Sequence, residues 1–323
     1  MMKVGILGAG GMGNVHARQY RKMSDVELHF FDPLPDKSEQ YAKQWEANPH
    51  SSPEELISAV DVVDVCLPTD LHVEAALRSI SAGRAVFVEK PLARTLVDCR
   101  TLIEAADKGN VPLMVGQVVR FFPDFAKGHQ LVAAGKIGTP SAARTRRGGT
   151  APMGSRGWFQ DYERSGGVLL DLAVHDFDWL RWTLGEIKHL YSRSVGIQAG
   201  SGPDYALTTL TFHSGAVAHV EATWMDPSGF RTTFEVAGSQ GLIQHDSRQN
   251  VALRTSVDGR IFNDGAISPT DDPYYVELRS FLNAVKGGST PPVTGYDGAM
   301  AVSIALAAIE SAKSGQVVVP ESI

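Results

Sequence analysis

The fold of this chain is set near its beginning, by the stretch Gly8-Ala9-Gly10-Gly11-Met12-Gly13. This stretch fits the pattern G-x-G-x-x-G, follows an apolar run at Val4–Leu7 and opens a helical pattern. The first glycine permits a tight turn, the second lets the backbone approach a pyrophosphate, and the third lets the helix pack closely on the strand. The free N–H groups at the helix N-terminus favour phosphate binding. The alternative is a glycine turn that binds no ligand.

The segments around this loop alternate between strand-like and helical patterns. Strands are predicted at Lys3–Leu7, Glu27–Phe31, Val62–Leu67, Ala85–Val88 and Leu113–Gly116. Helices are predicted between them, at Met12–Lys22, Asp36–Trp45, Pro53–Ala59, His72–Ala82 and Thr95–Lys108. Strands that are separated by helices make right-handed crossovers, which produce a parallel sheet covered on both faces. The sequence therefore predicts an α/β fold that begins with a doubly wound, Rossmann-type domain.

The pattern changes near residue 118. A helix is predicted over Phe122–Ala134, a glycine-rich loop over Gly148–Gly167 and one continuous helix over Leu169–Leu184. Strands with two-residue alternation follow at Leu207–Phe212, Ala216–Trp224, Thr232–Ala237 and Gly241–His245, and helices at Pro273–Lys286 and Gly298–Ser314 end the chain. Short turns between consecutive strands indicate an antiparallel sheet. We therefore expect two domains, residues 1–118 and 119–323.

Composition and charge narrow the functional classes. Of the 323 residues, 43% are hydrophobic and 20% are charged, which is typical of a globular protein. The formal net charge of −6 argues against a nucleic-acid partner, because phosphate backbones are bound by clustered Lys and Arg. We interpret the basic cluster Arg144, Arg146 and Arg147 as solvated. Two cysteines without a CxxC motif and the lack of a long apolar segment favour a cytoplasmic protein without membrane association.

Asp32 ends the second predicted strand. A carboxylate at this place accepts hydrogen bonds from the ribose hydroxyls of a dinucleotide. It would repel the 2′-phosphate of NADP, and Pro33 and Leu34 follow it where an arginine would be needed to hold that phosphate. We therefore expect NAD as the cofactor, in preference to NADP. The alternative is that Asp32 only shapes the turn before Pro33.

Lys90 directly follows the strand Ala85–Val88, within the sequence Glu89-Lys90-Pro91. Ligands of doubly wound sheets bind at the carboxyl ends of the strands, so Lys90 should face the cleft. An ammonium group there can donate a hydrogen bond to a substrate oxygen and stabilise negative charge that develops on it. The alternative is an ordinary surface charge.

A polar stripe of Asp171, His175 and Asp178 is predicted on the helix over Leu169–Leu184, because residues three or four apart share a helix face. Histidine exchanges a proton near neutral pH, and a carboxylate one turn away can orient it and raise its pKa. This suits a general base that takes an alcohol proton. One alternative is a zinc site, but three ligands on one helix face without a clear fourth make it a poor one. The other alternative is that His175 is a structural histidine.

Together these motifs resemble the glucose–fructose oxidoreductase, inositol dehydrogenase and rhizopine-catabolism family (Gfo/Idh/MocA). The resemblance rests on the segments Gly8–Gly13, Cys66–His72, Ala82–Leu92, Gly135–Gly138 and Gly166–Asp178. It implies a Rossmann domain followed by a C-terminal α/β domain with an open, mostly antiparallel sheet. Because that sheet often forms an oligomer interface in the family, we expect a homodimer or homotetramer.

The resemblance also implies roles for individual residues. The family's catalytic lysine, aspartate and histidine fall on Lys90, Asp171 and His175. The expected cofactor contacts are Gly8, Gly10, Gly11, Met12, Gly13, Asp32, Leu67, Pro68, Thr69, His72, Glu89 and Lys90. The expected substrate contacts are Arg120, Trp158, Asp171, His175 and Tyr274, and no metal site is expected.

These patterns predict an oxidoreductase that transfers a hydride between NAD and a CH–OH group of a polyol, sugar or inositol. In the expected mechanism His175 takes the hydroxyl proton, Lys90 holds the oxygen and Asp171 orients the charged groups. One alternative is an NAD-dependent glycoside hydrolase of the same family, which oxidises its substrate only transiently. Another is a non-enzymatic nucleotide-sensing module, although such a module has no need for all three polar residues.

Overall fold

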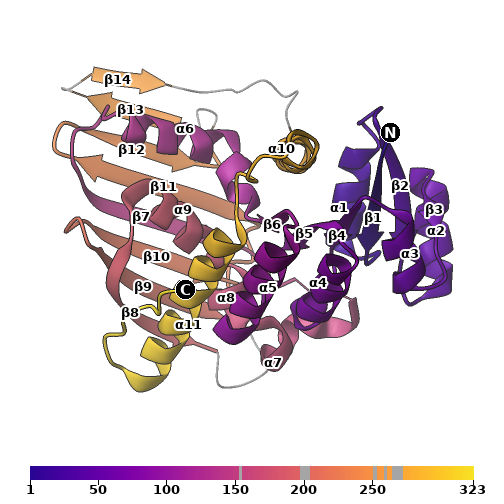
Figure 1. Cartoon of the computed structure of the whole chain (residues 1–323). Helices are drawn as coiled ribbons and strands as arrows, with labels where there is room; N and C mark the ends of the chain where they lie inside the picture. Colours follow the sequence, from indigo (N-terminus) through magenta and orange to yellow (C-terminus); the bar gives the residue numbers. More distant parts are fainter. Residues whose placement is uncertain (153–154, 197–203, 250–252, 258–259, 264–271) are drawn as a thin grey trace.

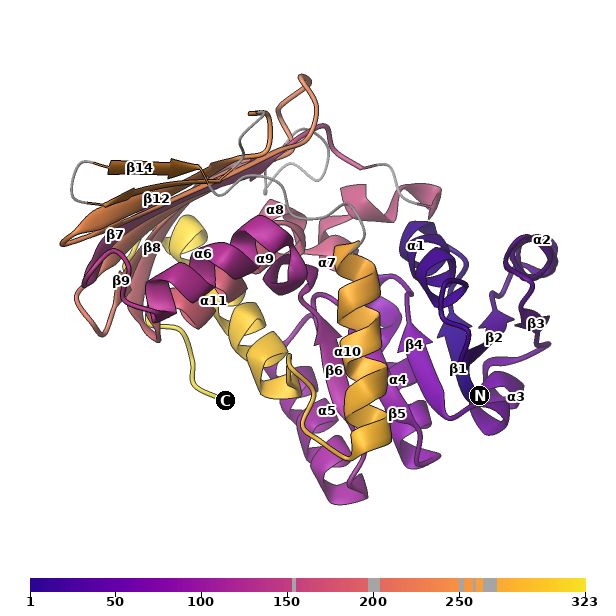
Figure 2. The same ribbon diagram turned by 90° about the horizontal axis from the view of Figure 1, so that it is seen from above.

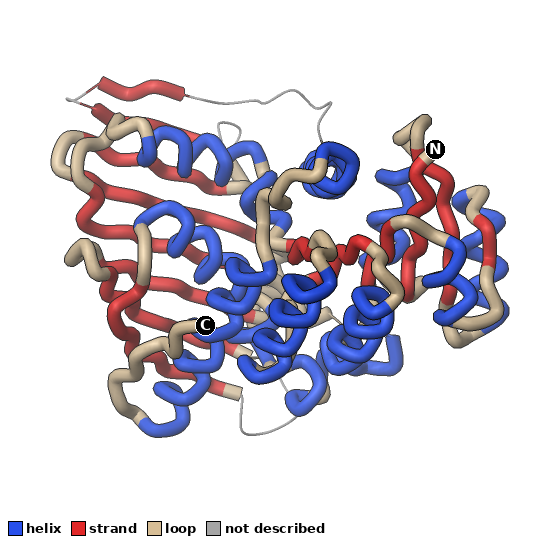
Figure 3. The backbone as a smooth tube through the Cα atoms, in the orientation of Figure 1, coloured by secondary structure: helices blue, strands red, loops and turns tan. Residues whose placement is uncertain are grey.

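Two β-sheets with helices between and around them make up the molecule (Figures 1 and 3). The computed structural model describes the whole chain except residues 153–154, 197–203, 250–252, 258–259 and 264–271. The N-terminal third of the chain forms one sheet, and most of the remainder forms the other.

The first sheet is parallel, with six strands in the order β3-β2-β1-β4-β5-β6. Its strands are β1 (Met2–Leu7), β2 (Val26–Phe31), β3 (Asn48–Pro49), β4 (Val62–Val65), β5 (Ala85–Glu89) and β6 (Leu113–Gly116). The helices between them are α1 (Gly11–Tyr20), α2 (Pro35–Trp45), α3 (Pro53–Ala59), α4 (His72–Ser81) and α5 (Leu96–Gly109), with the 3-10 turn η1 (Thr69–Leu71) before α4. This strand order places a switch point between β1 and β4, and the predicted doubly wound fold is confirmed.

Local sequence explains why these elements form. The strand β4 is buried along its whole length, as expected of a parallel strand that is covered on both faces. Ser52 caps α3, because its side-chain oxygen accepts a hydrogen bond from the N–H of Glu55 at 3.1 Å. The two-residue strand β3 was not predicted, since Asn48-Pro49 carries no alternating or β-branched pattern.

The second sheet has eight strands in the order β14-β13-β12-β11-β7-β10-β9-β8. Its strands are β7 (Pro140–Gly148), β8 (Ile187–Val195), β9 (Tyr205–Phe212), β10 (Val217–Thr223), β11 (Arg231–Gly238), β12 (Gly241–Asp246), β13 (Leu253–Val257) and β14 (Arg260–Asn263). Among the strand pairs that the described residues form in this sheet, β7 and β10 alone are parallel, so the expected mostly antiparallel sheet is confirmed. The strands β7, β8, β13 and β14 were not among the sequence predictions.

Helices cover one side of this sheet, and this side is turned toward the parallel sheet (Figure 2). They are α6 (Pro123–Ala133), α8 (Gly167–Asp171), α9 (Val174–Leu184) and α11 (Gly295–Ser314), and the 3-10 turn η2 (Val118–Phe121) leads into α6. The helix α10 (Pro273–Gly287) instead packs against α1 of the first sheet. None of the helices in the described ranges combines the length and apolar content that a membrane span needs.

The predicted continuous helix over Leu169–Leu184 is wrong. It is broken into α8, which ends at Asp171, and α9, which begins at Val174. In a continuous helix the carbonyl oxygen of Asp171 would accept from the N–H of His175. Here that oxygen accepts from Lys90 Nζ at 2.6 Å, and the His175 N–H donates to Leu172 instead. The long-range contact with Lys90 therefore takes the place of the helical hydrogen bond.

Two further predictions need correction. The segment Gly148–Gly167 is not only loop, because it contains the turn η3 (Ser155–Gln160) and the short helix α7 (Tyr162–Ser165). The arginine cluster on β7 is not uniformly solvated. Arg144 is exposed, but Arg147 is buried on the helix-covered face and donates to the carboxylate of Asp176 at 2.7 Å. Burial of its guanidinium is compensated by that ion pair.

Candidate active site

The glycine loop connects β1 to α1 at the carboxyl edge of the parallel sheet. Gly8 has a φ of +105°, which favours glycine, and a Cβ atom on Gly13 would clash with the carbonyl oxygen of Gly8. A Cβ atom on Gly10 or Gly11, by contrast, would meet no atom within 4 Å. The loop is therefore closed where helix meets strand and open at the helix N-terminus, and this shape fits a pyrophosphate.

Asp32 lies beside this loop and is half-buried. Its Oδ2 accepts a hydrogen bond from the N–H of Ala9 at 2.8 Å, and its Oδ1 accepts one from the N–H of Leu34 at 2.9 Å. Asp32 thus shapes the turn after β2 and also holds the glycine loop. A carboxylate has about four acceptor positions, so both oxygens keep capacity for ribose hydroxyls. The loop and Asp32 together fit a dinucleotide.

The loop after β4 contains the other expected cofactor contacts. His72 is almost fully buried, and its two ring nitrogens each lie 2.9 Å from a backbone carbonyl oxygen, of Leu67 and of Pro91. His72 therefore fastens the loop after β4 to the segment that follows Lys90. Contacts of Leu67, Pro68, Thr69 and His72 with the cofactor stay predictions.

Lys90 extends from the end of β5 to α8. Its Nζ donates hydrogen bonds to the Oδ1 atom of Asp171 at 2.9 Å and to the carbonyl oxygen of Asp171 at 2.6 Å. The side chains of Lys90 and Asp171 are only 18% and 8% exposed, which does not fit a solvated surface charge. The ion pair joins the carboxyl edge of the parallel sheet to the helical layer of the second sheet.

His175 lies in the first turn of α9 and is buried, and its Nδ1 atom has no hydrogen-bond partner among the described residues. Burial lowers the pKa of His175 well below its ordinary value of 6.5, and the positive charges of Lys90 and Arg147 lower it further. The prediction that a neighbouring carboxylate raises the pKa of His175 is therefore wrong. A neutral imidazole with a free nitrogen can accept a proton directly.

The third member of the predicted stripe, Asp178, is engaged elsewhere. Arg120 forms a bidentate pair with Asp178 at 2.6 and 2.7 Å, lies 3.2 Å from Asp297 and stacks over the Trp182 ring. Because the helix breaks after Asp171, the predicted single polar face is not formed. Arg120 is almost completely buried, and its contact with a substrate stays a prediction.

The two aromatic residues expected to contact substrate lie in separate elements. Trp158, in η3, stacks on Phe159 with ring centroids 3.9 Å apart. Tyr274 lies in the first turn of α10, and the centroid of its ring is 6.0 Å from that of His16 and 6.4 Å from that of Phe122. The sequence did not predict where either side chain lies, and the contacts of Trp158 and Tyr274 with substrate stay predictions.

Sequence analysis did not identify His16, Asp64 or Glu277, all of which are fully buried. Asp64 carried a signal, because a carboxylate within the valine run of β4 requires a buried partner. That partner is His16, whose Nδ1 lies 2.9 Å from Asp64 Oδ2. No pattern in α1 or α10 marks His16 or Glu277.

Comparison with known proteins places this site in a family. Residues 2–117 match the model described as "Oxidoreductase family, NAD-binding Rossmann fold", and residues 125–244 match the "GFO/IDH/MocA C-terminal domain". The chain belongs to the Gfo/Idh/MocA family of oxidoreductases. The resemblance inferred from the sequence motifs is thereby confirmed.

Members of this family with named activities are similar over nearly the whole chain. The myo-inositol 2-dehydrogenase of Thermotoga maritima is 32% identical over 96% of each chain. The scyllo-inositol 2-dehydrogenase (NAD(+)) of Bacillus subtilis is 30% identical over 97% of this chain and 95% of the relative. The crystal structure of GenD2 from gentamicin A biosynthesis in complex with NAD is 27% identical, with a TM-score of 0.88 and coverage of 99% and 97%.

The electrostatics of His175 give a first prediction. Substitution Lys90→Met removes a positive charge beside the ring, so the pKa of His175 should rise, whereas Lys90→Arg should leave it nearly unchanged. The measurement is an NMR titration of the labelled imidazole in the parent and both variants. A parent pKa at or above 6.5, or equal values in all three proteins, would contradict this account.

The same shift fixes the sign of a stability effect. Folding keeps His175 neutral, so its contribution to stability is present above about pH 6.5, the unfolded value, and is lost as the pH falls toward the lowered pKa. The variant His175→Gln should therefore lose less stability than the parent between neutral and acidic pH, as measured by urea unfolding.

Proposed function

We propose that this protein is an NAD-dependent dehydrogenase that transfers a hydride between NAD and a CH–OH carbon of a polyol, sugar or inositol. The observation that carries the proposal is the largely buried Lys90–Asp171 pair together with the neutral His175, at the carboxyl edge of a dinucleotide-binding sheet. Two relatives named as inositol 2-dehydrogenases, similar over almost the whole chain, support a polyol as the substrate class.

The side chains divide the chemistry between them. NAD, when bound, supplies the acceptor for the hydride. The Lys90 ammonium has three N–H donors, of which two bind Asp171, so one remains for the substrate oxygen and stabilises alkoxide character on it. His175, which is neutral, takes the hydroxyl proton as the C=O bond forms, and returns it in the reverse direction. Asp171 holds Lys90 in place and balances its charge.

One relative favours a second candidate function without net oxidation. The 2,7-anhydro-N-acetylneuraminate hydratase of Escherichia coli is 29% identical over 77% of this chain and 68% of the relative, and its name describes addition of water. An NAD-dependent glycoside hydrolase would also catalyse a reaction without net oxidation, so NADH would not accumulate in either case. The non-enzymatic sensing module is disfavoured, since burial of an imidazole nitrogen without a hydrogen-bond partner, as at His175 Nδ1, is costly without a chemical use.

Release of NADH separates these functions. Incubation with NAD and a panel of inositols, sugars and sugar acids should raise absorbance at the reduced-nicotinamide band. Lys90→Met and His175→Ala should each lower kcat by about 10²–10⁴-fold with NAD affinity unchanged, because each removes an acid–base or charge-stabilising group. Lys188→Met, on the exposed surface of β8, is the matched control and should keep the parent rate. Turnover by Lys90→Met at the parent rate would refute the assignment.

We also propose that NAD is preferred over NADP. Asp32 keeps acceptor capacity for ribose hydroxyls and opposes a 2′-phosphate, and each hydrogen bond to a charged group contributes about 1.5–3 kcal/mol. Fluorescence titration should show tighter binding of NAD, and Asp32→Ala should narrow the difference between the cofactors. Asp36→Ala, in the exposed first turn of α2, should not. Tighter binding of NADP by the parent would contradict this proposal.

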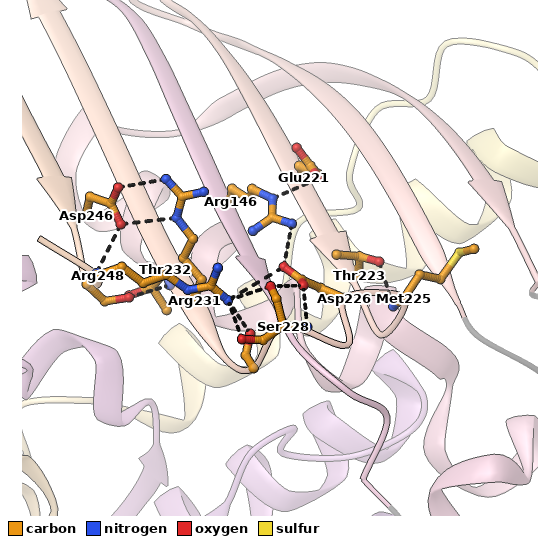
Figure 4. Close-up of polar contacts among 12 residues, drawn as sticks. Arg146, Glu221, Thr223, Met225, Asp226, Ser228, Arg231, Thr232, Asp246 and Arg248 are labelled. Atoms are coloured by element: carbon orange, nitrogen blue, oxygen red, sulfur yellow. Dashed lines mark hydrogen bonds and ion pairs between the residues drawn. The ribbon is translucent and has the colours of Figure 1, made fainter.

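We infer that the open face of the eight-stranded sheet binds a second copy of the chain. Among the described residues this face carries no helix (Figure 2). On β8, β9 and β10 it exposes Tyr191, Leu207 and Val217. Figure 4 shows polar contacts at one end of β7, β10, β11 and β12, where Arg146 pairs with Glu221 and Asp226, and Arg231 pairs with Asp246. Because opposite charges are already paired there, a partner can cover them without leaving a charge unpaired.

Light scattering tests this interface. The parent should form a dimer or tetramer at micromolar concentration, and Leu207→Lys should shift it toward the monomer mass of 34.8 kDa. Val97→Lys, at an even more exposed apolar site on α5, should have no effect. A monomeric parent would contradict the proposal.

A cytoplasmic location also remains our proposal, supported by Cys66 and Cys99, which are both buried free thiols.

A further inference from the structure

A cluster of buried titratable side chains adjoins the catalytic lysine and has no part in the mechanism above. It consists of His16 on α1, Asp64 on β4, Glu89 at the end of β5 and Glu277 on α10. Glu89 is 5% exposed and the other three are fully buried. Burial of so many ionisable groups is costly unless they bind one another or serve a purpose. The cluster thus includes residues of the parallel-sheet domain and of α10, a helix near the C-terminal end of the chain.

His16 lies at the centre of this cluster, between two carboxylates. Its Nδ1 is 2.9 Å from Asp64 Oδ2, and its Nε2 is 3.1 Å from Glu89 Oε1. The ring is hydrogen-bonded to Asp64 through Nδ1, whereas Nε2 lies within ion-pair distance of Glu89 Oε1 without forming a hydrogen bond to it. Burial lowers the pKa of His16, but the neighbouring Cys66 and Asp64 raise it well above 6.5 in total. His16 is therefore an imidazolium that bridges two strands.

Glu89 connects this imidazolium to Lys90. While Oε1 faces His16, Oε2 accepts a hydrogen bond from the backbone N–H of Lys90 at 3.1 Å. The neighbouring strand closes the space, because a Cβ atom on Gly116 would lie 3.1 Å from Glu89 Oε1. The carboxylate is thus held by a hydrogen bond at Oε2 and by the ion pair with His16 at Oε1. The expected role of Glu89 as a cofactor contact stays a prediction, but its oxygens point to protein groups.

Glu277 completes the cluster without competing for His16. Both of its carboxyl oxygens are buried and have no hydrogen-bond partner in the described part of the chain. Burial raises the pKa of Glu277 well above its ordinary value, and the Glu89 charge raises it further, so it is a neutral acid. The other titratable groups near His16 are Cys66, Tyr20 and Tyr274, whose pKa values are also raised by burial. One imidazolium between two carboxylates is therefore the charged core.

We propose that His16 and Glu89 are positioning residues for Lys90. The imidazolium of His16 anchors the Glu89 carboxylate, and this carboxylate holds the backbone of Lys90 so that its Nζ lies against Asp171. The inference rests on the proposed function, because that function makes Lys90 catalytic. A displacement of about 1 Å at a reacting group costs on the order of 10²-fold in rate, so these residues affect catalysis without touching substrate.

The test compares His16→Gln and Glu89→Gln with a matched control, His29→Gln. His29 on β2 is also a buried histidine beside a carboxylate, with Nε2 3.2 Å from Glu27 Oε1, but it has no link to Lys90. The first readout is the rate at which acetic anhydride modifies Lys90, followed by peptide mass spectrometry across pH. This readout does not require enzymatic activity. The second is kcat and KM for the best polyol.

We expect faster modification of Lys90 in His16→Gln and Glu89→Gln, and parent behaviour in His29→Gln. In the two cluster variants kcat should fall by about 10²-fold with little change in the affinity for NAD. The double variant should be little worse than either single variant, because the two residues act in one chain of contacts. Glu89→Gln preserves shape, so it remains informative if His16→Gln does not fold.

Three results would overturn the proposal. The first is unchanged Lys90 modification in Glu89→Gln, and the second is an equal effect in His29→Gln, which would indicate general destabilisation. The third is a stoichiometric metal ion in the purified protein that His16→Gln removes, because the ligand atoms of His16, Asp64 and Cys66 lie within 4.8 Å of one another. Altered Lys90 modification without NADH formation by the parent would support positioning and refute the proposed dehydrogenase.

Discussion

The ion pair between Lys90 and Asp171 is the contact on which the rest of the site depends. Lys90 Nζ binds both the carboxylate and the carbonyl oxygen of Asp171, and the second bond replaces the one that would continue α8 into α9. The chain therefore restarts its helix at Val174, and His175 enters the site from a first turn. One lysine thus connects the end of β5 to α8, at the point where the helical hydrogen bonding is interrupted before His175.

The charges around this pair are arranged so that His175 stays neutral. The acidic residues of α9 have their own arginines, since Asp176 pairs with Arg147 and Asp178 pairs with Arg120. Asp171 is occupied by Lys90. His175 is consequently buried and lies near the positive charges of Lys90 and Arg147. Both burial and these charges disfavour its protonated form. The site combines a cationic donor with a neutral acceptor, which is the pairing that removal of an alcohol proton requires.

Local signals in the sequence predicted the features that depend on neighbours in the chain. The glycine loop, the parallel strands and the place of Lys90 at a strand end follow from spacing and burial patterns within a few residues. The break between α8 and α9 does not, because the hydrogen bond that takes the place of the helical one joins residues 81 positions apart. The buried pair of Arg147 with Asp176 and the partner of Asp64 are equally non-local. A charged residue inside an apolar segment indicates that a buried partner exists, but the sequence does not show which residue that partner is.

The most direct test of the central claim is a crystal structure with NAD and a polyol substrate. The account predicts one hydroxyl oxygen within about 3.2 Å of both Lys90 Nζ and a ring nitrogen of His175, with the carbon that bears it facing the nicotinamide. Asp171 should keep its contact with Lys90 in that complex. A substrate bound with its reacting carbon away from Lys90 and His175, or a nicotinamide on the other side of the parallel sheet, would contradict the account.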